Sequence, residues 1–227
     1  MLETRGVLYV VATPIGHLKD LSFRAVEVLK EVDWIACEDT RHSKVLLDHY
    51  GIQKPLISYF DFSESKKAPH IVQKLKSGQN GALISDAGTP GISDPGYRLV
   101  RLCIDEGVGI EAVPGPSALI TALVLSGLPT DRFVFEGFMP IKEGQRKNRL
   151  VSLKDETRTV IFYESPHRLL KTLAAIQAVY GDVPIVAARE LTKKFQEICR
   201  DKVSAIRERF EKGKVLGEFV ILWNLKT

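Results

Sequence analysis

The stretch that decides the fold is GALISDAGTPGISDPG, residues 81–96. It begins with the short apolar run 81–85, which has the length and composition of a buried strand. The loop that follows, residues 85–96, packs three glycines, two prolines and two aspartates into twelve residues. Glycine allows the backbone to approach a ligand closely, and proline stiffens a loop. A connection that only turns the chain needs far fewer such residues, so this loop is predicted to bind a ligand.

Outward from this loop, apolar runs rich in β-branched residues alternate with helical patterns along the whole chain. Near-continuous apolar strands between amphipathic helices are typical of a parallel sheet covered on both faces. The pattern changes at the rigid turn Pro114–Pro116. We therefore predict two α/β domains, residues 1–114 with a mainly parallel sheet and residues 115–227 with a mixed sheet.

The expected elements follow from these patterns. The predicted strands of the first domain are 7–12, 34–37, 56–58, 81–85 and 109–113, and its helices are 22–30, 43–50, 68–76 and one that Asp94 caps, with Pro95 as its first residue. The predicted strands of the second domain are 133–137, 159–163, 185–188 and 219–224, and its helices are 117–126, 145–154, 166–179 and 202–212.

Composition narrows the class of protein. The 227 residues are 44% hydrophobic and 26% charged, as in ordinary globular proteins, and no apolar run approaches the roughly 20 residues that span a bilayer. The N-terminal residues run directly into the first expected strand, so no secretory signal is expected. Three widely spaced cysteines without a C-x-x-C pair favour free thiols in the cytoplasm. The five histidines show no H-x-x-x-H or H-E-x-x-H spacing, so no metal site is expected.

Charge is distributed unevenly along the chain. Residues 1–113 contain 13 Lys and Arg against 15 Asp and Glu, whereas residues 114–227 contain 19 against 13. The first half is therefore −2 and the second +6, from a total of +4. A basic second half permits a polyanionic partner, although a few extra lysines are also compatible with a solvated surface.

Several polar motifs follow predicted strands. The first turn, 13–18, is not G-x-G-x-x-G, yet ligands bind at such turns on the carboxyl edge of a parallel sheet. Glu38–Arg41 places two carboxylates and a guanidinium at the same edge, where they form either a site or a simple salt-bridge cluster. The turn at residues 114–118 feeds a helix, and its small residues would let a ligand approach a helix N-terminus.

The predicted second domain adds two more motifs. In Tyr163–Arg168, Ser165 and Pro166 match a helix cap and first helical residue, whereas Glu164, His167 and Arg168 exceed what capping requires. A basic cluster on the predicted helix 145–154 and just before it is either a solvated face or an RNA-binding face; it consists of Lys142, Arg146, Lys147 and Arg149.

Taken together, these motifs resemble the small-subunit rRNA methyltransferase I family, which is similar to the tetrapyrrole methylases. The segments that carry the resemblance, in the family's order and spacing, are 13–16, 38–41, 85–96, 114–118, 138–140, 163–168, 189–193 and 217–219. The S-D-A-G-T-P-x-I-S-D-P-G loop and the E-D-T-R segment are highly specific. One departure is that residues 59–64 lack the His and Asn that members often place before the glutamate.

The resemblance implies 2′-O-methylation of a cytidine in the decoding region of 16S rRNA, with S-adenosyl-L-methionine as methyl donor. It also implies a homodimer, a partner that is 16S rRNA or the small ribosomal subunit, and a cofactor site in a cleft between the two domains. By matching motif, the cofactor contacts would be Pro14, Asp86, Ala87, Gly88, Thr89, Ser117, Ala118 and Tyr163.

A mechanism consistent with this resemblance needs a proton acceptor, because a ribose hydroxyl is a poor nucleophile. General-base catalysis contributes roughly 10²–10⁴-fold. We expect Asp39, Glu164 or His167 to accept the proton. Arginine and lysine side chains would hold the RNA, Arg because its planar fork matches phosphate; the expected contacts are Arg41, Arg168, Arg189, Lys193, Arg146 and Lys147.

Two alternatives remain open at this point. One is an enzyme of the same fold that methylates a small macrocycle or a protein side chain, which would have no need of a basic second domain. The other is a non-catalytic RNA-binding factor for ribosome assembly that has kept a nucleotide pocket. Such a factor would bind RNA but transfer no methyl group.

Overall fold

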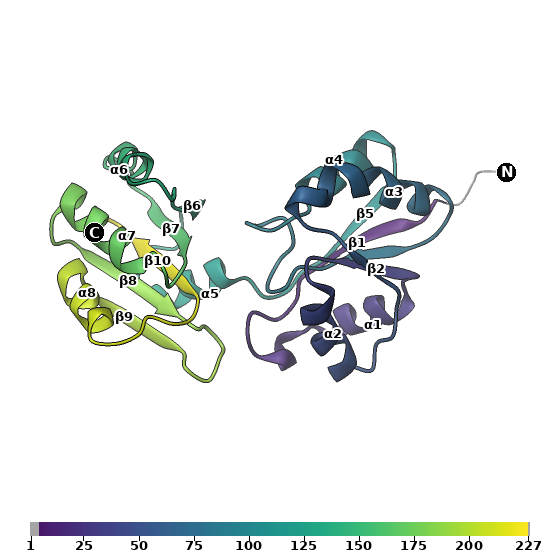
Figure 1. The fold of residues 1–227 in the computed structure, drawn as a ribbon, viewed down its shortest axis with the longest axis horizontal. Helices are drawn as coiled ribbons and strands as arrows, with labels where there is room; N and C mark the ends of the chain where they lie inside the picture. The colour runs from purple at the N-terminus through teal and green to yellow at the C-terminus, as the bar shows by residue number, and fades with distance from the viewer. Residues whose placement is uncertain (1–4, 227) are drawn as a thin grey trace. The chain divides into compact units, whose positions relative to one another are not determined.

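A computed structural model describes residues 5–226 of the chain (Figure 1). Residues 1–4 lie outside the described part, and so does the N-terminus on which the expectation of no secretory signal rests. The chain divides between Ser117 and Ala118 into two compact units, each with its own five-stranded sheet. The predicted α/β class is confirmed, with a parallel sheet in the first unit and a mixed sheet in the second.

The first unit is built on a sheet with strand order β3-β2-β4-β1-β5, in which every neighbouring pair is parallel. Its strands are β1 (Val7–Val11), β2 (Trp34–Cys37), β3 (Leu56–Ser58), β4 (Gly81–Leu83) and β5 (Gly109–Val113). Its helices are α1 (Phe23–Glu31), α2 (Thr40–His49), α3 (Glu64–Lys76) and α4 (Tyr97–Asp105), with short 3-10 helices η1 (Leu18–Asp20) and η2 (Asp61–Ser63).

Both faces of this sheet are covered, because successive side chains of a strand point to opposite faces. On β2, Ile35 belongs to a core shared with α1 and α2, whereas its neighbours Trp34 and Ala36 belong to a core shared with α3 and α4. Figure 1 shows α1 and α2 on one side of the sheet and α3 and α4 on the other. Two buried faces explain why the strands read as continuous apolar runs.

The second unit has strand order β6-β7-β10-β8-β9, with β6 and β7 parallel and the other pairs antiparallel. Its strands are β6 (Phe133–Phe138), β7 (Thr159–Glu164), β8 (Pro184–Arg189), β9 (Glu197–Lys202) and β10 (Phe219–Trp223). Its helices are α5 (Ala118–Ser126), α6 (Glu143–Ser152), α7 (Leu169–Tyr180) and α8 (Val203–Glu211).

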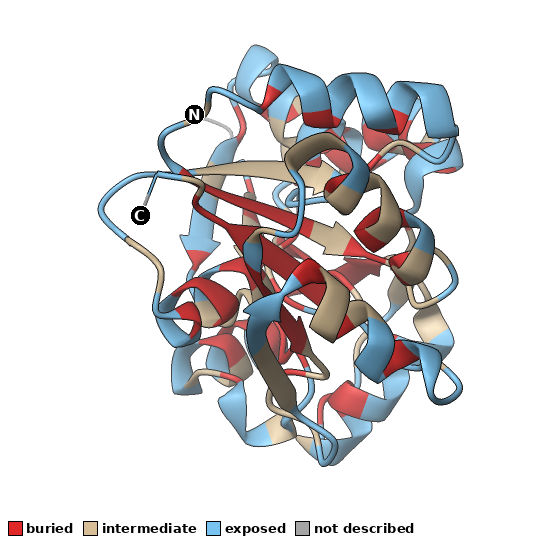
Figure 2. Ribbon diagram, turned by 90° about the vertical axis from the view of Figure 1, so that its left-hand side faces the viewer, coloured by how far each residue is buried: buried red, intermediate tan, exposed pale blue. Residues whose placement is uncertain are grey.

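Helices α6, α7 and α8 share one apolar core with alternate residues of the second sheet, among them Phe162 and Trp223. Figure 2 shows buried residues concentrated in the strands and exposed residues along the outer sides of the helices. Helix α5 packs against β7, β8, β9 and β10. The Arg200 guanidinium of β9 donates to the carbonyls of Leu125 and Ser126 at the C-terminal end of α5, where carbonyls lack helical partners.

Helices α4 and α7 begin more than one residue later than the sequence predicts. Asp94 does not cap α4: the helix begins at Tyr97, and the preceding Gly96 has a φ of 149° that favours glycine. The Gly96 N–H donates to the buried Glu64 carboxylate at 2.8 Å, so a distant side chain takes the place of a local cap. Helix α7 likewise begins at Leu169, because Pro166–Arg168 form a turn.

One strand is not predicted from the sequence pattern. β9 (Glu197–Lys202) pairs only with β8, at the edge of the second sheet, and four of its six residues are charged. Among residues 5–226, no helix is both long and apolar enough to cross a membrane.

Candidate functional site

The loops that follow β1, β4 and β5 are tied together at the carboxyl edge of the first sheet. The backbones of Thr13 and Gly88 exchange hydrogen bonds of 2.8 and 3.1 Å, which join the first loop to the glycine-proline loop after β4. The Thr89 hydroxyl donates to the Pro116 carbonyl at 3.1 Å and so adds the loop after β5. Three segments far apart in sequence therefore form one braced structure.

Two glycines of these loops have different causes. Gly88 has a φ of 85°, in the left-handed region that favours glycine. A Cβ at Gly115 would lie 3.0 Å from the Cβ of Ala12, so glycine there allows the third loop to pack closely against the residue after β1. The cause is backbone conformation at Gly88 and close packing at Gly115.

The structure brings together most of the residues expected to contact a cofactor. Pro14 adjoins the Thr13–Gly88 bridge, the segment Asp86–Thr89 lies in the second loop, and Ser117 follows the bonded Pro116. Ala118 begins α5, and Tyr163 lies on β7 of the second unit, where it contacts the rings of Phe135 and Phe138.

A pocket of about 530 Å³ lies beside these joined loops, at the ends of β2, β3 and β4. Its walls come from the last residue of β3 and from residues that follow the three strands: Glu38, Asp39, Thr40, Arg41, Ser58, Phe60, Asp61, Phe62 and Asp86. Asp86 belongs both to the pocket and to the glycine-proline loop, and its carboxylate accepts a hydrogen bond from the Asp39 N–H at 3.2 Å. Four carboxylates and two phenylalanines thus share one concave surface.

The two adjacent acids of the E-D-T-R segment have opposite electrostatic properties. Partial burial raises the pKa of Glu38 above its ordinary value, and the charges of Asp86 and Asp61 add to the effect. Hydrogen bonds from Arg41 hold the pKa of Asp39 well below its ordinary range. The Arg41 backbone N–H and Nη2 both lie 2.8 Å from this carboxylate, which caps α2. Glu38 is therefore the better proton acceptor near neutral pH, although the sequence pattern pointed to Asp39.

Asp94, expected to be a helix cap, instead lies among the acidic groups of this edge. Burial raises its pKa to about 7, and the charges of Glu38, Asp86 and Asp61 act in the same direction. The neutral carboxyl is favoured in the folded protein. This group therefore contributes stability that is fully present below its unfolded pKa near 4 and is lost as the pH rises through 7.

Replacing Asp94 by asparagine should remove this pH dependence. Between pH 4 and pH 8, the wild-type free energy of unfolding should fall by up to about 4 kcal/mol relative to the variant, since each pKa unit is worth about 1.4 kcal/mol. Urea unfolding at a series of pH values measures the difference. The exposed Asp155→Asn serves as the matched control, and parallel pH profiles for wild type and Asp94→Asn would contradict the prediction.

Glu164 and Arg168 form a buried structural pair in the second unit. The Glu164 side chain is almost fully buried, accepts hydrogen bonds from Thr172 Oγ1 at 2.5 Å and from its neighbour's N–H at 2.8 Å, and pairs with Arg168 at 2.7 Å. Arg168 also donates to the Met139 carbonyl. These contacts do not favour Glu164 as a proton acceptor, because its oxygens already have partners. His167 is exposed, and its role stays a prediction.

The basic residues expected to hold RNA differ in how freely they present their charge. The Arg41 side chain is 90% exposed and pairs with Asp39 at 2.8 Å, whereas Lys147 is exposed on α6. Arg189 bonds to the Leu216 carbonyl and pairs with Glu197, and Lys193 pairs with Glu190 and Glu218.

Arg146 requires a correction, because it does not belong to an exposed basic face. It is 5% exposed and donates to the carbonyls of Pro140 and Ile141. Its side chain therefore supports the loop between β6 and α6 and does not reach solvent. Leu150, one helical turn further on, is buried on the same side of α6.

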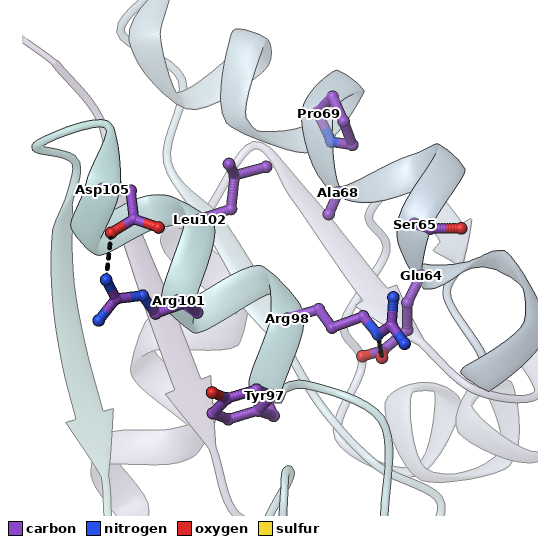
Figure 3. A pocket seen from close by; sticks show the side chains of 9 residues that line it. All are labelled: Glu64, Ser65, Ala68, Pro69, Tyr97, Arg98, Arg101, Leu102 and Asp105. Carbon is purple, nitrogen blue, oxygen red and sulfur yellow. Dashed lines mark ion pairs between the residues drawn. The ribbon is translucent and has the colours of Figure 1, made fainter.

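A second pocket, of about 350 Å³, lies between α3 and α4 (Figure 3). Its principal charges pair within the pocket: Arg98 with Glu64 and Arg101 with Asp105. We assign no ligand to it. Over residues 5–226, no group of three or more His, Cys, Asp and Glu side chains is arranged to hold a metal ion.

Sequence reasoning did not single out four residues that line the first pocket: Glu38, Phe60, Asp61 and Phe62. Glu38 stood next to the Asp39 that was singled out, and only the fold shows that burial and Asp61 act on it. The signal that could have found the phenylalanines is the alternation of aromatic and acidic residues directly after a short strand.

The chain is similar to known proteins both in sequence and in fold. Residues 7–207 match the family model for tetrapyrrole (corrin/porphyrin) methylases. The chain is 50% identical over 225 residues to ribosomal RNA small subunit methyltransferase I of Haemophilus influenzae, covering 98% of this chain and 80% of that protein. It is 53% identical to the protein of that name from Escherichia coli O157:H7, covering 97% and 78%. The crystal structure of cobalt precorrin-4 methyltransferase superposes with a TM-score of 0.70 at 17% identity, covering 95% of this chain and 94% of the other.

Proposed function

Because the chain belongs to the tetrapyrrole methylase family, and within it to the ribosomal RNA small subunit methyltransferase I group, we propose that it methylates the 2′ hydroxyl of a cytidine in the decoding region of 16S rRNA. The observation that carries this proposal is identity of about half over nearly the whole chain. In this proposal the methyl donor is S-adenosyl-L-methionine, and the methyl transfer takes place in the cytoplasm.

The braced loops suit this donor. When bound, S-adenosyl-L-methionine supplies a methyl group activated by a positively charged sulfur. Asp86 uses one carboxylate oxygen to accept from the Asp39 N–H, and a carboxylate has further acceptor positions for a ribose hydroxyl or an ammonium group. Pro14, the Asp86–Thr89 segment and Ser117 of the first unit would hold the donor. Contacts from Ala118 and Tyr163 stay predictions from the family resemblance. Loops already tied by backbone hydrogen bonds need little rearrangement to do so.

Glu38 accepts the proton of the attacking hydroxyl in this proposal. Its carboxyl lines the pocket next to Asp86, and burial raises its pKa, which makes the carboxylate a stronger base than that of an ordinary glutamate. Asp39 and Glu164 are less suited, because Arg41 holds the first in its charged form and burial with Arg168 engages the second. His167 remains as the other candidate.

Arg41 and Lys147 are the strongest candidates for RNA phosphate contacts, since both are exposed. Arg168, Arg189 and Lys193 would share their charge between phosphate and their present carboxylate partners. The enzyme is further proposed to act as a homodimer. In support, α5 exposes the apolar Ile120, Val124 and Leu125, which a second copy could cover. Light scattering that gave the mass of one chain would exclude the dimer.

Small ribosomal subunits from cells that lack this protein provide the test of function. Purified protein with labelled donor should add one methyl group per subunit, and mapping of 2′-O-methylated positions should place it on a cytidine of the decoding region. Calorimetry should detect binding of the donor or its demethylated product. RNA binding without methyl transfer would indicate an assembly factor, and transfer only to a macrocycle or a protein would indicate another activity of the fold.

A further inference from the structure

We propose that Phe60 and Phe62 form an aromatic platform on which the base of the target nucleotide stacks. The inference rests on the proposed function and names the residues that would hold the acceptor. Both side chains line the 530 Å³ pocket at the ends of β2, β3 and β4. Phe62 is 93% exposed and Phe60 is 39% exposed. Two solvent-exposed phenylalanines in one pocket wall call for an explanation, because exposed apolar clusters mark binding surfaces.

The local structure does not require either ring. The 3-10 helix η2 is held by Ser63, whose hydroxyl donates to the Phe60 carbonyl at 2.9 Å and accepts from the Phe60 N–H at 3.1 Å. These bonds use the Phe60 backbone and the Ser63 side chain only. Burial of a phenylalanine side chain stabilises the folded state, and Phe62 is too exposed in the isolated chain to contribute much of this stabilisation. The Phe62 ring contributes this stabilisation only when a bound group covers it.

Strand order places this platform on the acceptor side of the site. The residues proposed to hold the donor follow β4, β1 and β5, which are consecutive in the sheet. The platform follows β3 and faces the pocket shared with the ends of β2 and β4. Asp86, after β4, belongs to both groups. A base stacked on Phe62 would thus hold its nucleotide next to the donor loop, with Glu38 in the same pocket.

A base is the occupant that fits the chemistry of the walls. Bases of single-stranded or splayed RNA stack on aromatic side chains. The pocket also contains Asp61 and Glu38, neither of which forms an ion pair with a Lys or Arg among residues 5–226. A carboxylate accepts a hydrogen bond from the exocyclic amino group of cytosine, whereas the corresponding oxygen of uracil is itself an acceptor and is repelled. Lys67 lies 5.4 Å from the centre of the Phe60 ring and adds a positive charge for the nearby phosphates.

Phe62→Ala provides the first test, with small ribosomal subunits as substrate. Stacking of one base on an aromatic ring changes affinity by about 10-fold, so the KM for subunits should rise by about that factor. Affinity for S-adenosylhomocysteine, measured by calorimetry, should stay within twofold, and Phe62→Trp should restore the KM. The matched control is Phe23→Ala, which removes a ring that is 90% exposed on α1 outside the pocket.

Each other outcome would overturn the platform. An unchanged KM in Phe62→Ala and in Phe60→Ala would show that neither ring is covered. Weaker cofactor binding at unchanged KM would show that the rings hold the adenine of the donor. Wild-type protein that transfers no methyl group would remove the proposed function itself, a result separate from any difference among the variants.

Asp61→Asn tests the polar edge of the same pocket. With subunits carrying uridine in place of the target cytidine, wild type should discriminate strongly between the two substrates. Asparagine can donate to the uracil oxygen, so the variant should narrow the ratio of kcat/KM values by about 10-fold or more. Equal ratios for wild type and variant would remove Asp61 from base recognition.

Discussion

Glu38→Gln should lower the rate of methyl transfer by about 10²-fold or more while leaving cofactor affinity unchanged. Glutamine keeps the shape of the side chain but cannot accept a proton, and general-base catalysis contributes about 10²–10⁴-fold. Wild-type activity should rise with pH as Glu38 ionises, through a pKa above the ordinary glutamate value. The variant should lack that rise. Single-turnover transfer of labelled methyl to small subunits measures the chemical step separately from product release.

Asp39→Asn is the matched control for this prediction. Asparagine is as good a helix cap as aspartate, so α2 should be retained while the ion pair with Arg41 is lost. Activity should fall only a few-fold, through Arg41. Full activity in Glu38→Gln combined with inactivity of Asp39→Asn or of His167→Ala would transfer the role of base to the residue that fails.

Glu164→Ala should have the largest effect on stability. Removing one partner of a buried ion pair costs about 3–5 kcal/mol, because the remaining charge has no partner. In this protein the charge belongs to Arg168, whose side chain is only 20% exposed, and Thr172 and the Ser165 N–H also lose their acceptor. Urea unfolding followed by the fluorescence of Trp223 reports on the second unit, since that side chain lies in its core.

A double variant separates the buried pair from catalysis. Glu164→Gln with Arg168→Met should be destabilised by less than the sum of the two single changes, because neither charge then remains unpaired. At a temperature where all variants are folded, Glu164→Gln should retain methyl transfer. Loss of activity of about 10²-fold with unchanged stability would instead support the expectation, drawn from the sequence, that Glu164 accepts the proton.

Much of the fold could be predicted because its signals are local. The bounds of β2, β3 and β5 follow from short, mostly apolar runs that are bounded by polar, glycine or proline residues, and the structure reproduces these bounds. The start of α4 could not be predicted, because the Asp-Pro pair at 94–95 has the local chemistry of a cap. The start of this helix depends instead on Glu64, about 30 residues away, whose carboxylate accepts a hydrogen bond from the Gly96 N–H.

Side-chain environments were harder to predict than elements. The basic run around Arg146 suggests a charged surface, yet Arg146 and Leu150 stand four residues apart on α6 and are both buried. The i, i+4 spacing of these two residues is visible in the sequence. Because an arginine is seldom buried, the basic composition nevertheless favoured the prediction of an exposed face. Burial and neighbouring acids raise the pKa of Glu38, whereas hydrogen bonds from Arg41 lower the pKa of Asp39, and the sequence pattern shows neither difference.

The bridge between Thr13 and Gly88 joins two loops through backbone groups alone, which nearly every amino acid possesses. An exposed residue such as Ile92, which lies outside this bridge and outside the proposed donor contacts, can therefore be exchanged without breaking these two hydrogen bonds. Variation at such positions would leave the connection between the two loops intact.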